Sequence, residues 1–335
     1  MLFIGDFMYN QNELKMVVLS LINKEMPLSL ISKLLDIDYN KVYKTINLLR
    51  MDGFNITEKV YANGEIRYIL NKTAKLNNQY KNTIITEPNE NEIEVLVTSD
   101  IHFGSNYENR YLLNSMIDYC LKNNLHIIIN CGDFIEGIVN LSNINIPWNE
   151  QIHHAIMEYP QINDIVTFLL LGNHDYSLLS NFGQDIRTFI KNKRFDIMPL
   201  GYGRSNIKIK NDELLLEHYI SERKVPHDNY KNKIIMKGHG HEAKFRLDGV
   251  NYIINLPSLS NLNFNKSSFP GMIKLKLQFL KGNINNMIVE QLSLINGNVY
   301  TTGEYKVFTG RGKSYKEDTI IENEEYYIKE YKKVR

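Results

Sequence analysis

Apolar residues near the start of the chain recur at the spacing of amphipathic helices. Between about residues 10 and 51 they form three groups, each with the repeat that places side chains on one helix face. The three faces are Leu14, Val17, Val18, Leu21 and Ile22; Leu30, Ile31, Leu34 and Leu35; and Val42, Ile46 and Leu49. Pro27 permits the second helix to begin, and Asp38 is placed to cap the amino terminus of the third.

Two short segments with strand-like alternation follow the third helix. They span residues 56–61 and 65–70, and Asn63-Gly64 between them is the strongest short signal for a β-hairpin. Three helices followed by a hairpin resemble a winged helix-turn-helix. We therefore predict such a domain over residues 1–72, with residues 39–51 as its recognition helix and 56–70 as its wing.

The polar side of the predicted recognition helix suggests a surface for nucleic acid, because winged-helix domains often deliver this helix into the major groove. Acidic residues nearly balance basic ones across residues 1–72, so a role in dimerisation or packing stays open. The residues expected to face outward and to contact DNA are Tyr39, Lys41, Lys44, Asn47 and Arg50.

The rest of the chain divides into a linker, a large domain and a tail. Residues 73–92 are polar and include Pro88-Asn89, which indicates a linker. Residues 93–300 hold most of the apolar runs, including the alternating late strand at 273–277. Residues 301–335 mix Tyr, Lys and Glu, and we expect a strand followed by a charged tail.

Polar motifs follow apolar runs in the large domain. Runs such as 127–129 and 214–216 predict buried strands, so the motifs should stand at strand ends along one edge. Such an edge can hold several ligands at fixed separations. The five motifs are Asp100-Ile101-His102, Gly132-Asp133, Gly172-Asn173-His174-Asp175, His218 and Gly238-His239-Gly240-His241.

The residue types in these motifs suit divalent metal ions. Carboxylate and imidazole groups bind first-row divalent metals, and one carboxylate can bridge two ions about 3.5–4 Å apart. Because side chains alternate along a strand, Asp100 and His102 should point to the same side, as should His239 and His241. Each motif alone is common, so the prediction of a dimetal centre depends on their joint occurrence. The glycines expected to let the backbone turn sharply are Gly132, Gly172, Gly238 and Gly240.

Two histidine assignments have alternatives. His227 could replace His218, although it lies in a polar stretch that is less like a strand end. His153 and His154 lie between the second and third motifs, and we interpret them as a surface pair.

The ordered motifs resemble the signature of the calcineurin-like metallophosphoesterase superfamily over about residues 93–260. The resemblance implies an α/β fold, a four-layer α/β/β/α sandwich, with a dimetal site on loops at one edge. It also implies a substrate-facing role for His174 as general acid or phosphate stabiliser, oriented by Asp175. The implied ligands are Asp100, His102, Asp133 and His241 for one metal, and Asp133, Asn173, His218 and His239 for the other.

Three local details bear on the resemblance. Many family members have Asp where this chain has Glu136, and many have Gly where it has Tyr219. The stretch from Asp100 to Gly104 looks most like the branch of DNA repair nucleases. This local similarity and the predicted winged helix both favour nucleic acid as the substrate.

Together these features predict a metal-dependent phosphodiesterase, most simply a DNA nuclease using two Mn²⁺ ions, with Fe, Zn or Mg as other candidates. The alternatives are a small-molecule phosphodiesterase or phosphatase acting on nucleotides, and a catalytically silent binding scaffold. DNA or another nucleic acid is the expected partner, and a homodimer stays open.

The composition fits a globular cytoplasmic protein. Of the 335 residues, 43% are hydrophobic and 23% are charged, and the net charge is +1. No apolar run approaches the ~18 residues that a membrane span needs. The first residues do not resemble a secretory signal, and the two cysteines, Cys120 and Cys131, do not suggest a disulfide framework.

Overall fold

The structure is a computed structural model, and it describes residues 9–71, 82–220, 233–261, 269–295 and 298–309. Within these ranges no helix is both long and apolar enough to cross a membrane. The helices are α1 (Gln11–Ile22), α2 (Leu28–Leu35), α3 (Tyr39–Met51), α4 (Arg110–Lys122), α5 (Trp148–Glu158), α6 (Asn173–Phe182) and α7 (Ile186–Lys193), with a short 3₁₀ helix at Leu141–Asn143.

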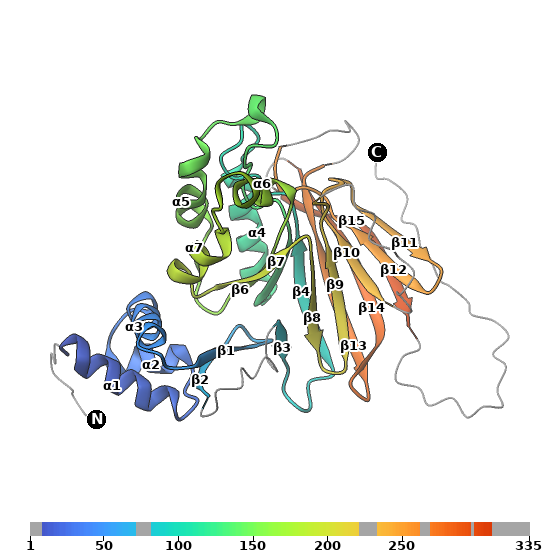
Figure 1. Ribbon diagram of the computed structural model, residues 1–335. Helices are drawn as coiled ribbons and strands as arrows, with labels where there is room; N and C mark the ends of the chain where they lie inside the picture. The colour runs from blue at the N-terminus through green and yellow to red at the C-terminus, as the bar shows by residue number, and fades with distance from the viewer. Residues whose placement is uncertain (1–8, 72–81, 221–232, 262–268, 296–297, 310–335) are drawn as a thin grey trace.

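The strands form two sheets that pack face to face (Figure 1). The seven-stranded sheet has the order β15 (Asn298–Phe308), β14 (Asn283–Ile295), β13 (Gly271–Leu280), β4 (Glu92–Thr98), β5 (Ile127–Cys131), β6 (Val166–Leu171) and β7 (Ile197–Tyr202). The eight-stranded sheet has the order β11 (Lys244–Asp248), β12 (Asn251–Asn255), β10 (Ile234–Lys237), β9 (Asp212–Glu217), β8 (Arg204–Ile209), β3 (Thr83–Ile85), β1 (Ile56–Tyr61) and β2 (Ile66–Leu70).

Alternation along the strands builds two separate apolar layers. In β4, Val95 and Val97 point into the space between the sheets, while Leu96 points to the opposite face. That opposite face is covered by α4 to α7, which lie together on one side of the sheet (Figure 1). Because parallel strands such as β4, β5 and β6 are buried on both faces, they read as continuous apolar runs. The predicted mixed α/β sandwich is confirmed.

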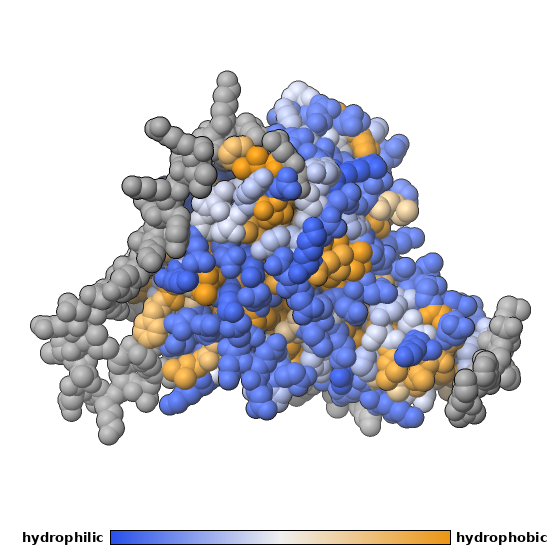
Figure 2. Space-filling view, turned by 180° about the vertical axis from the view of Figure 1, so that it is seen from behind, coloured by the Kyte–Doolittle hydropathy of each residue, from blue (hydrophilic) through white to orange (hydrophobic). Residues whose placement is uncertain are grey.

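The late strands complete the seven-stranded sheet. In β13, Leu275 and Leu277 are buried between the sheets, while Lys274 and Lys276 on the other face both pair with Glu94 of β4. The strand β15 pairs with β14 along its whole length, so the boundary predicted at residue 300 falls inside a strand of this sheet. The predicted charged tail beyond residue 309 lies outside the described residues. From behind, the surface is mostly hydrophilic, with small separate apolar patches (Figure 2).

The amino-terminal part has the predicted elements, three helices and then a hairpin. Asp38 caps α3, since its side chain accepts a hydrogen bond from the Lys41 backbone N–H. The hairpin of β1 and β2 does not stand alone. Strand β1 pairs with β3, which pairs with β8, so the hairpin extends the eight-stranded sheet. The predicted linker therefore contributes a strand, β3, although its first residues up to 81 lie outside the described part.

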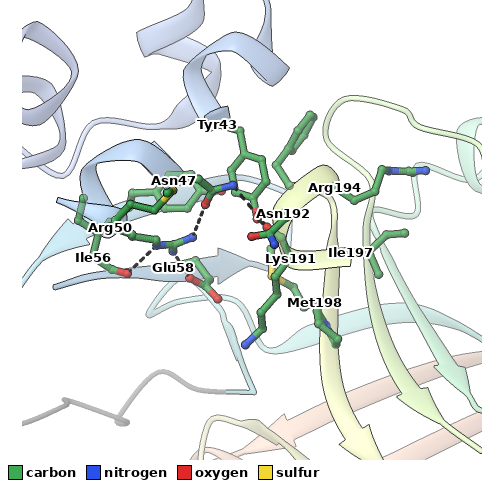
Figure 3. A pocket seen from close by; sticks show the side chains of 14 residues that line it. Tyr43, Asn47, Arg50, Ile56, Glu58, Lys191, Asn192, Arg194, Ile197 and Met198 are labelled. Atoms are coloured by element: carbon green, nitrogen blue, oxygen red, sulfur yellow. Dashed lines mark hydrogen bonds and ion pairs between the residues drawn. The ribbon is translucent and has the colours of Figure 1, made fainter. Parts of the chain in front are cut away.

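Helix α3 packs against α7 and the residues that follow it. The Phe195 ring lies 5.3 Å from the ring of Tyr39 and 6.2 Å from that of Tyr43, between ring centroids. The Tyr43 hydroxyl donates to the Lys191 carbonyl at the end of α7. A cavity of about 450 Å³ remains beside this contact. Figure 3 shows Asn47 and Arg50 on one side of it and Lys191 and Asn192 on the other.

The five residues expected to face outward for DNA therefore divide into two groups. Lys41 and Lys44 are exposed. Tyr39 is partly buried against Phe195, and Asn47 donates weakly to the Lys191 carbonyl at 3.4 Å. Arg50 bonds to Glu58 at 2.7 Å and to the Ile56 carbonyl at 3.1 Å (Figure 3). These three are only partly exposed, because the neighbouring α7 and hairpin supply partners that a helical wheel of α3 cannot show.

Replacing Phe195 should release this packing. Phe195 is 3% exposed, and removing a buried phenylalanine side chain typically costs about 3–5 kcal/mol. We expect Phe195→Ala to lower the melting temperature by several degrees, measured by calorimetry or circular dichroism. Phe189→Ala is the matched control, since Phe189 lies on α7 but is 47% exposed. Equal melting temperatures for the two variants would contradict the packing of Phe195 against α3.

Candidate metal centre

The five motifs meet at one edge of the two sheets, as the sequence predicted. Asp100 and His102 follow β4, Asp133 follows β5, and Asn173 and His174 begin α6 directly after β6. His218 follows β9, and His239 and His241 follow β10. Since β9 and β10 are parallel neighbours, their carboxyl ends lie at the same edge. Each sheet thus contributes part of a single cluster.

One group of side chains contains Asp100, His102 and His241, whose ligand atoms lie within 4.8 Å of one another. Asp100 Oδ1 is 3.0 Å from His241 Nε2 and 3.8 Å from His102 Nε2. The other oxygen of Asp100 accepts the backbone N–H of His239 at 3.0 Å. This group brings together three of the four ligands that the resemblance implied for the first metal. The fourth, Asp133, has its Oδ2 3.9 Å from His102 Nε2.

A second group contains Asp133, His218 and His239, again within 4.8 Å of one another. His218 Nε2 lies 2.9 Å from Asp133 Oδ2, and His218 Nδ1 donates to the Cys131 carbonyl at 2.6 Å. Burial lowers the pKa of His218, but the Asp133 carboxylate outweighs burial and raises it to about 9. The structure thus places His218 inside the cluster. The alternative, His227, lies outside the described residues.

The donor atoms of these groups fit divalent cations. His102 Nε2, Asp133 Oδ2, Asn173 Oδ1 and His218 Nε2 are buried and make no well-aligned hydrogen bond. A buried polar atom without a partner costs free energy, whereas two cations, one beside His102 and one beside Asn173 and His218, would satisfy these atoms. The other ring nitrogens of His102 and His218 are held by Glu136 and by the Cys131 carbonyl, which leaves each Nε2 for a metal.

The backbone at this edge is unusual. Five of the seven predicted ligands have positive φ angles, a conformation that costs a residue with a Cβ free energy. Strain of this kind persists only where the surrounding structure enforces it, and it concentrates at functional sites. The five angles are 56° at Asp100, 54° at His102, 51° at Asp133, 72° at His239 and 53° at His241.

His174 lies beside the two groups. Its backbone N–H donates to Asp133 Oδ1 at 3.0 Å, and its ring meets the His102 ring edge-on at 4.6 Å. Its Nδ1 donates to the Glu136 carbonyl at 2.6 Å, so Nε2 is the ring nitrogen left for a substrate. Glu136 also holds His102, since its Oε2 lies 2.9 Å from His102 Nδ1. This one residue therefore orients both imidazoles, a role that the sequence did not reveal.

Asp175 has a different role from the expected one. It was expected to orient the imidazole of His174, but its carboxylate instead accepts the backbone N–H groups of Phe134, Ile135 and Gly172 at 2.8–3.1 Å. Burial, together with the Asp133 charge, raises the pKa of Asp175 to about 7. Asp175 thus fixes the loop that follows β5. Asp175 does not reach the imidazole of His174 because adjacent helical residues point in different directions.

A comparison of the sequence with family profiles identifies the type of site that these residues form. The profile of calcineurin-like phosphoesterases matches residues 93–285, which is more than half of the 335 residues and includes every predicted metal ligand. The chain belongs to the calcineurin-like phosphoesterase family. It is therefore a phosphoester hydrolase that depends on divalent metal ions.

Solved structures of low sequence identity resemble this phosphoesterase. YfcE, a phosphoesterase from E. coli, is 13% identical, with a TM-score of 0.40 over 65% of this chain and 100% of that one. An archaeal phosphodiesterase is 16% identical, with a TM-score of 0.39 over 60% and 100%. Vps29 from Entamoeba histolytica, in complex with Zn²⁺, is 14% identical, with a TM-score of 0.35 over 65% and 99%. No curated protein sequence matches the chain significantly.

Side chains of α5 support the loops that carry the phosphoesterase ligands. Gln151 is fully buried, and its amide both accepts from the Gly137 N–H at 2.7 Å and donates to the Gly137 carbonyl at 3.2 Å. His154 lies 2.8 Å from Glu108, whose carboxylate accepts the Gly104 N–H at 2.8 Å. The interpretation of His154 as a surface residue was therefore wrong. These residues hold the loops after β4 and β5, and no motif in the sequence marks them.

Glycines let the phosphoesterase motifs approach one another. At Gly172, an added Cβ would come within 2.5 Å of His218 Cδ2 and still closer to Asp133 Oδ1. A Cβ added at Gly132 or Gly238 would crowd the His218 ring in the same way. Gly240 differs, since its φ is not positive and an added Cβ would meet nothing within 4 Å. Three of the four predicted glycines are thus required by close approach, and Gly240 is not.

A pair of alanine substitutions tests this crowding. Gly172→Ala should displace Asp133 or His218, so the purified protein should lose most of its bound Mn²⁺ after loading, measured by plasma mass spectrometry. Gly240→Ala is the matched control, in a motif that carries two predicted ligands, and it should keep the wild-type content. Circular dichroism checks that both variants fold. Wild-type metal content in Gly172→Ala would show that the ligand geometry is wrong.

Proposed function

We propose that this phosphoesterase hydrolyses phosphodiester bonds of nucleic acid, with DNA as the first candidate, and that it uses two Mn²⁺ ions. The observation that carries the proposal is the placement of His174 beside two adjoining groups of metal-ligating side chains. Bound divalent ions supply Lewis-acid chemistry to phosphoryl oxygens. One group would be Asp100, His102, Asp133 and His241, and the other Asp133, Asn173, His218 and His239.

His174 supplies what the metal ligands do not. The Glu136 carbonyl fixes the proton of Nδ1, so a protonated imidazole can give its Nε2 proton to the leaving oxygen. The side chain of His174 is 14% exposed, which leaves it accessible to a substrate, while Asp133 and His102 beside it are buried. General acid catalysis of this kind contributes typically 10²–10⁴-fold to the rate.

Two features support nucleic acid as the substrate. The stretch from Asp100 to Gly104 is similar to that of DNA repair nucleases, and three helices with a hairpin precede the catalytic domain. On α3, Lys41 and Lys44 are exposed and able to contact backbone phosphates. Tyr39, Asn47 and Arg50 are engaged within the protein, so the proposed contact is with phosphates rather than with bases.

Parallel assays of the wild-type protein and His174→Ala test this function. With Mn²⁺, the wild-type protein should cut labelled DNA and a chromogenic diester faster than a monoester. His174→Ala should keep its metal and lose about 10²–10⁴-fold in kcat on both diesters. Wild-type rates in the variant would remove His174 from the mechanism. Activity on a nucleotide diester alone, with no cleavage of DNA or RNA, would favour a small-molecule phosphodiesterase.

The part played by α3 can be tested through salt dependence. Each phosphate contact releases counterions, so the logarithm of the DNA affinity should fall with the logarithm of salt by about 0.9 per contact. Lys41→Ala with Lys44→Ala should weaken duplex binding and flatten that slope by roughly two contacts. The control removes two exposed lysines from other elements, Lys122 and Lys208. Identical slopes for the two double variants would leave α3 with a role in packing or dimerisation.

A further inference from the structure

An aromatic side chain lies at the accessible side of the metal cluster. Tyr219 directly follows His218, and its ring lies 5.0 Å from that of His239 at an interplanar angle of 31°. His239 is exposed, and its ring lies 5.4 Å from the buried ring of His218. The three rings therefore lead from the buried His218 to two exposed side chains, His239 and Tyr219.

The exposure of Tyr219 is the second observation. Tyr219 is 44% exposed, although it stands beside a cluster whose carboxylates, Asp100 and Asp133, are buried. Aromatic side chains that serve only a core are covered by their neighbours, as Tyr68 and Tyr159 are here at 1% and 2% exposure. Tyr219 instead offers apolar ring surface to any molecule that brings a phosphate to the ligands of the second group.

We propose that Tyr219 is the stacking platform for a nucleobase of the substrate, next to the phosphodiester that is cleaved. This inference rests on the proposed function and specifies its substrate as a nucleotidyl diester. Every base presents a flat face, so stacking on tyrosine adds affinity without selecting a sequence. The platform orients the nucleoside, while the metal ligands and His174 act on the phosphate.

Another role for Tyr219 would be to hold the imidazole of His239 in place. That role predicts loss of bound metal and equal losses on all substrates when the ring is removed. Stacking predicts a loss that depends on whether the substrate carries a base. The two roles therefore differ in metal content and in the ratio of rates on two diesters.

The test compares two diesters with the same p-nitrophenyl leaving group, one carrying thymidine and the other a methyl group. Tyr219→Ala should reduce the ratio of kcat/KM for the thymidine diester to kcat/KM for the methyl diester by roughly 5- to 150-fold, mainly through KM. Tyr219→Phe should restore the ratio, since the ring face is kept. Tyr300→Ala is the control, as Tyr300 is 50% exposed on β15.

The possible results distinguish base stacking by Tyr219, support of His239 and failure of the proposed function. An unchanged ratio in Tyr219→Ala, with an active wild-type protein, would overturn the stacking role alone. Lower metal content with equal losses on both diesters would instead assign Tyr219 to the support of His239. A wild-type protein that cleaves neither diester, but does cleave a monoester, would overturn the proposed function and the stacking role with it.

Discussion

The buried carboxylate of Asp133 is the constraint on which the site depends. It is 1% exposed, and burial alone would raise its pKa. The neighbouring histidines, above all His218, instead keep the pKa well below the ordinary value. One oxygen accepts the backbone N–H of His174, and the other lies 2.9 Å from His218. A buried charge of this kind is stable only when paired, so β6, β9 and the start of α6 must all converge on it. Gly172 is needed because any side chain there would enter the same space.

The position of the site was predictable because it follows from strand patterns. Apolar runs mark β4, β5, β6 and β9, and parallel strands bring their carboxyl ends to one edge whatever the details of the loops. What happens inside the loops was not predictable in this way. The positive φ angles at Asp100 and His102 place side chains by a backbone conformation that alternation does not describe.

The supporting residues escaped prediction for a different reason. Asp175 and Glu136 were both visible in the motifs, but their roles depend on which backbone groups come near them in the folded chain. Gln151 lies in a helix with no recognisable motif, and only the fold shows that its amide bonds both the N–H and the carbonyl of Gly137. In the same way, the polar face of α3 indicated exposed side chains, whereas the Arg50 guanidinium donates a hydrogen bond to Glu58 in the following hairpin.

The attachment of the amino-terminal unit limits how it can act on a substrate. Strand β3 pairs with β8 at Ile209, and Ile209 lies opposite Asp212 at the start of β9. His218 lies six residues further along, at the opposite end of that strand, which corresponds to about 20 Å at ~3.3 Å per residue. In Figure 1, α1 to α3 accordingly lie at the far end of the sheets from α6. If nucleic acid is the substrate, a molecule that reaches both α3 and the metal cluster must be long enough to pass from one end of the sheets to the other. Under the proposed function, the unit would retain a longer substrate at a distance from the metal cluster, while the metal ligands and His174 act on the phosphate and Tyr219 stacks on the base.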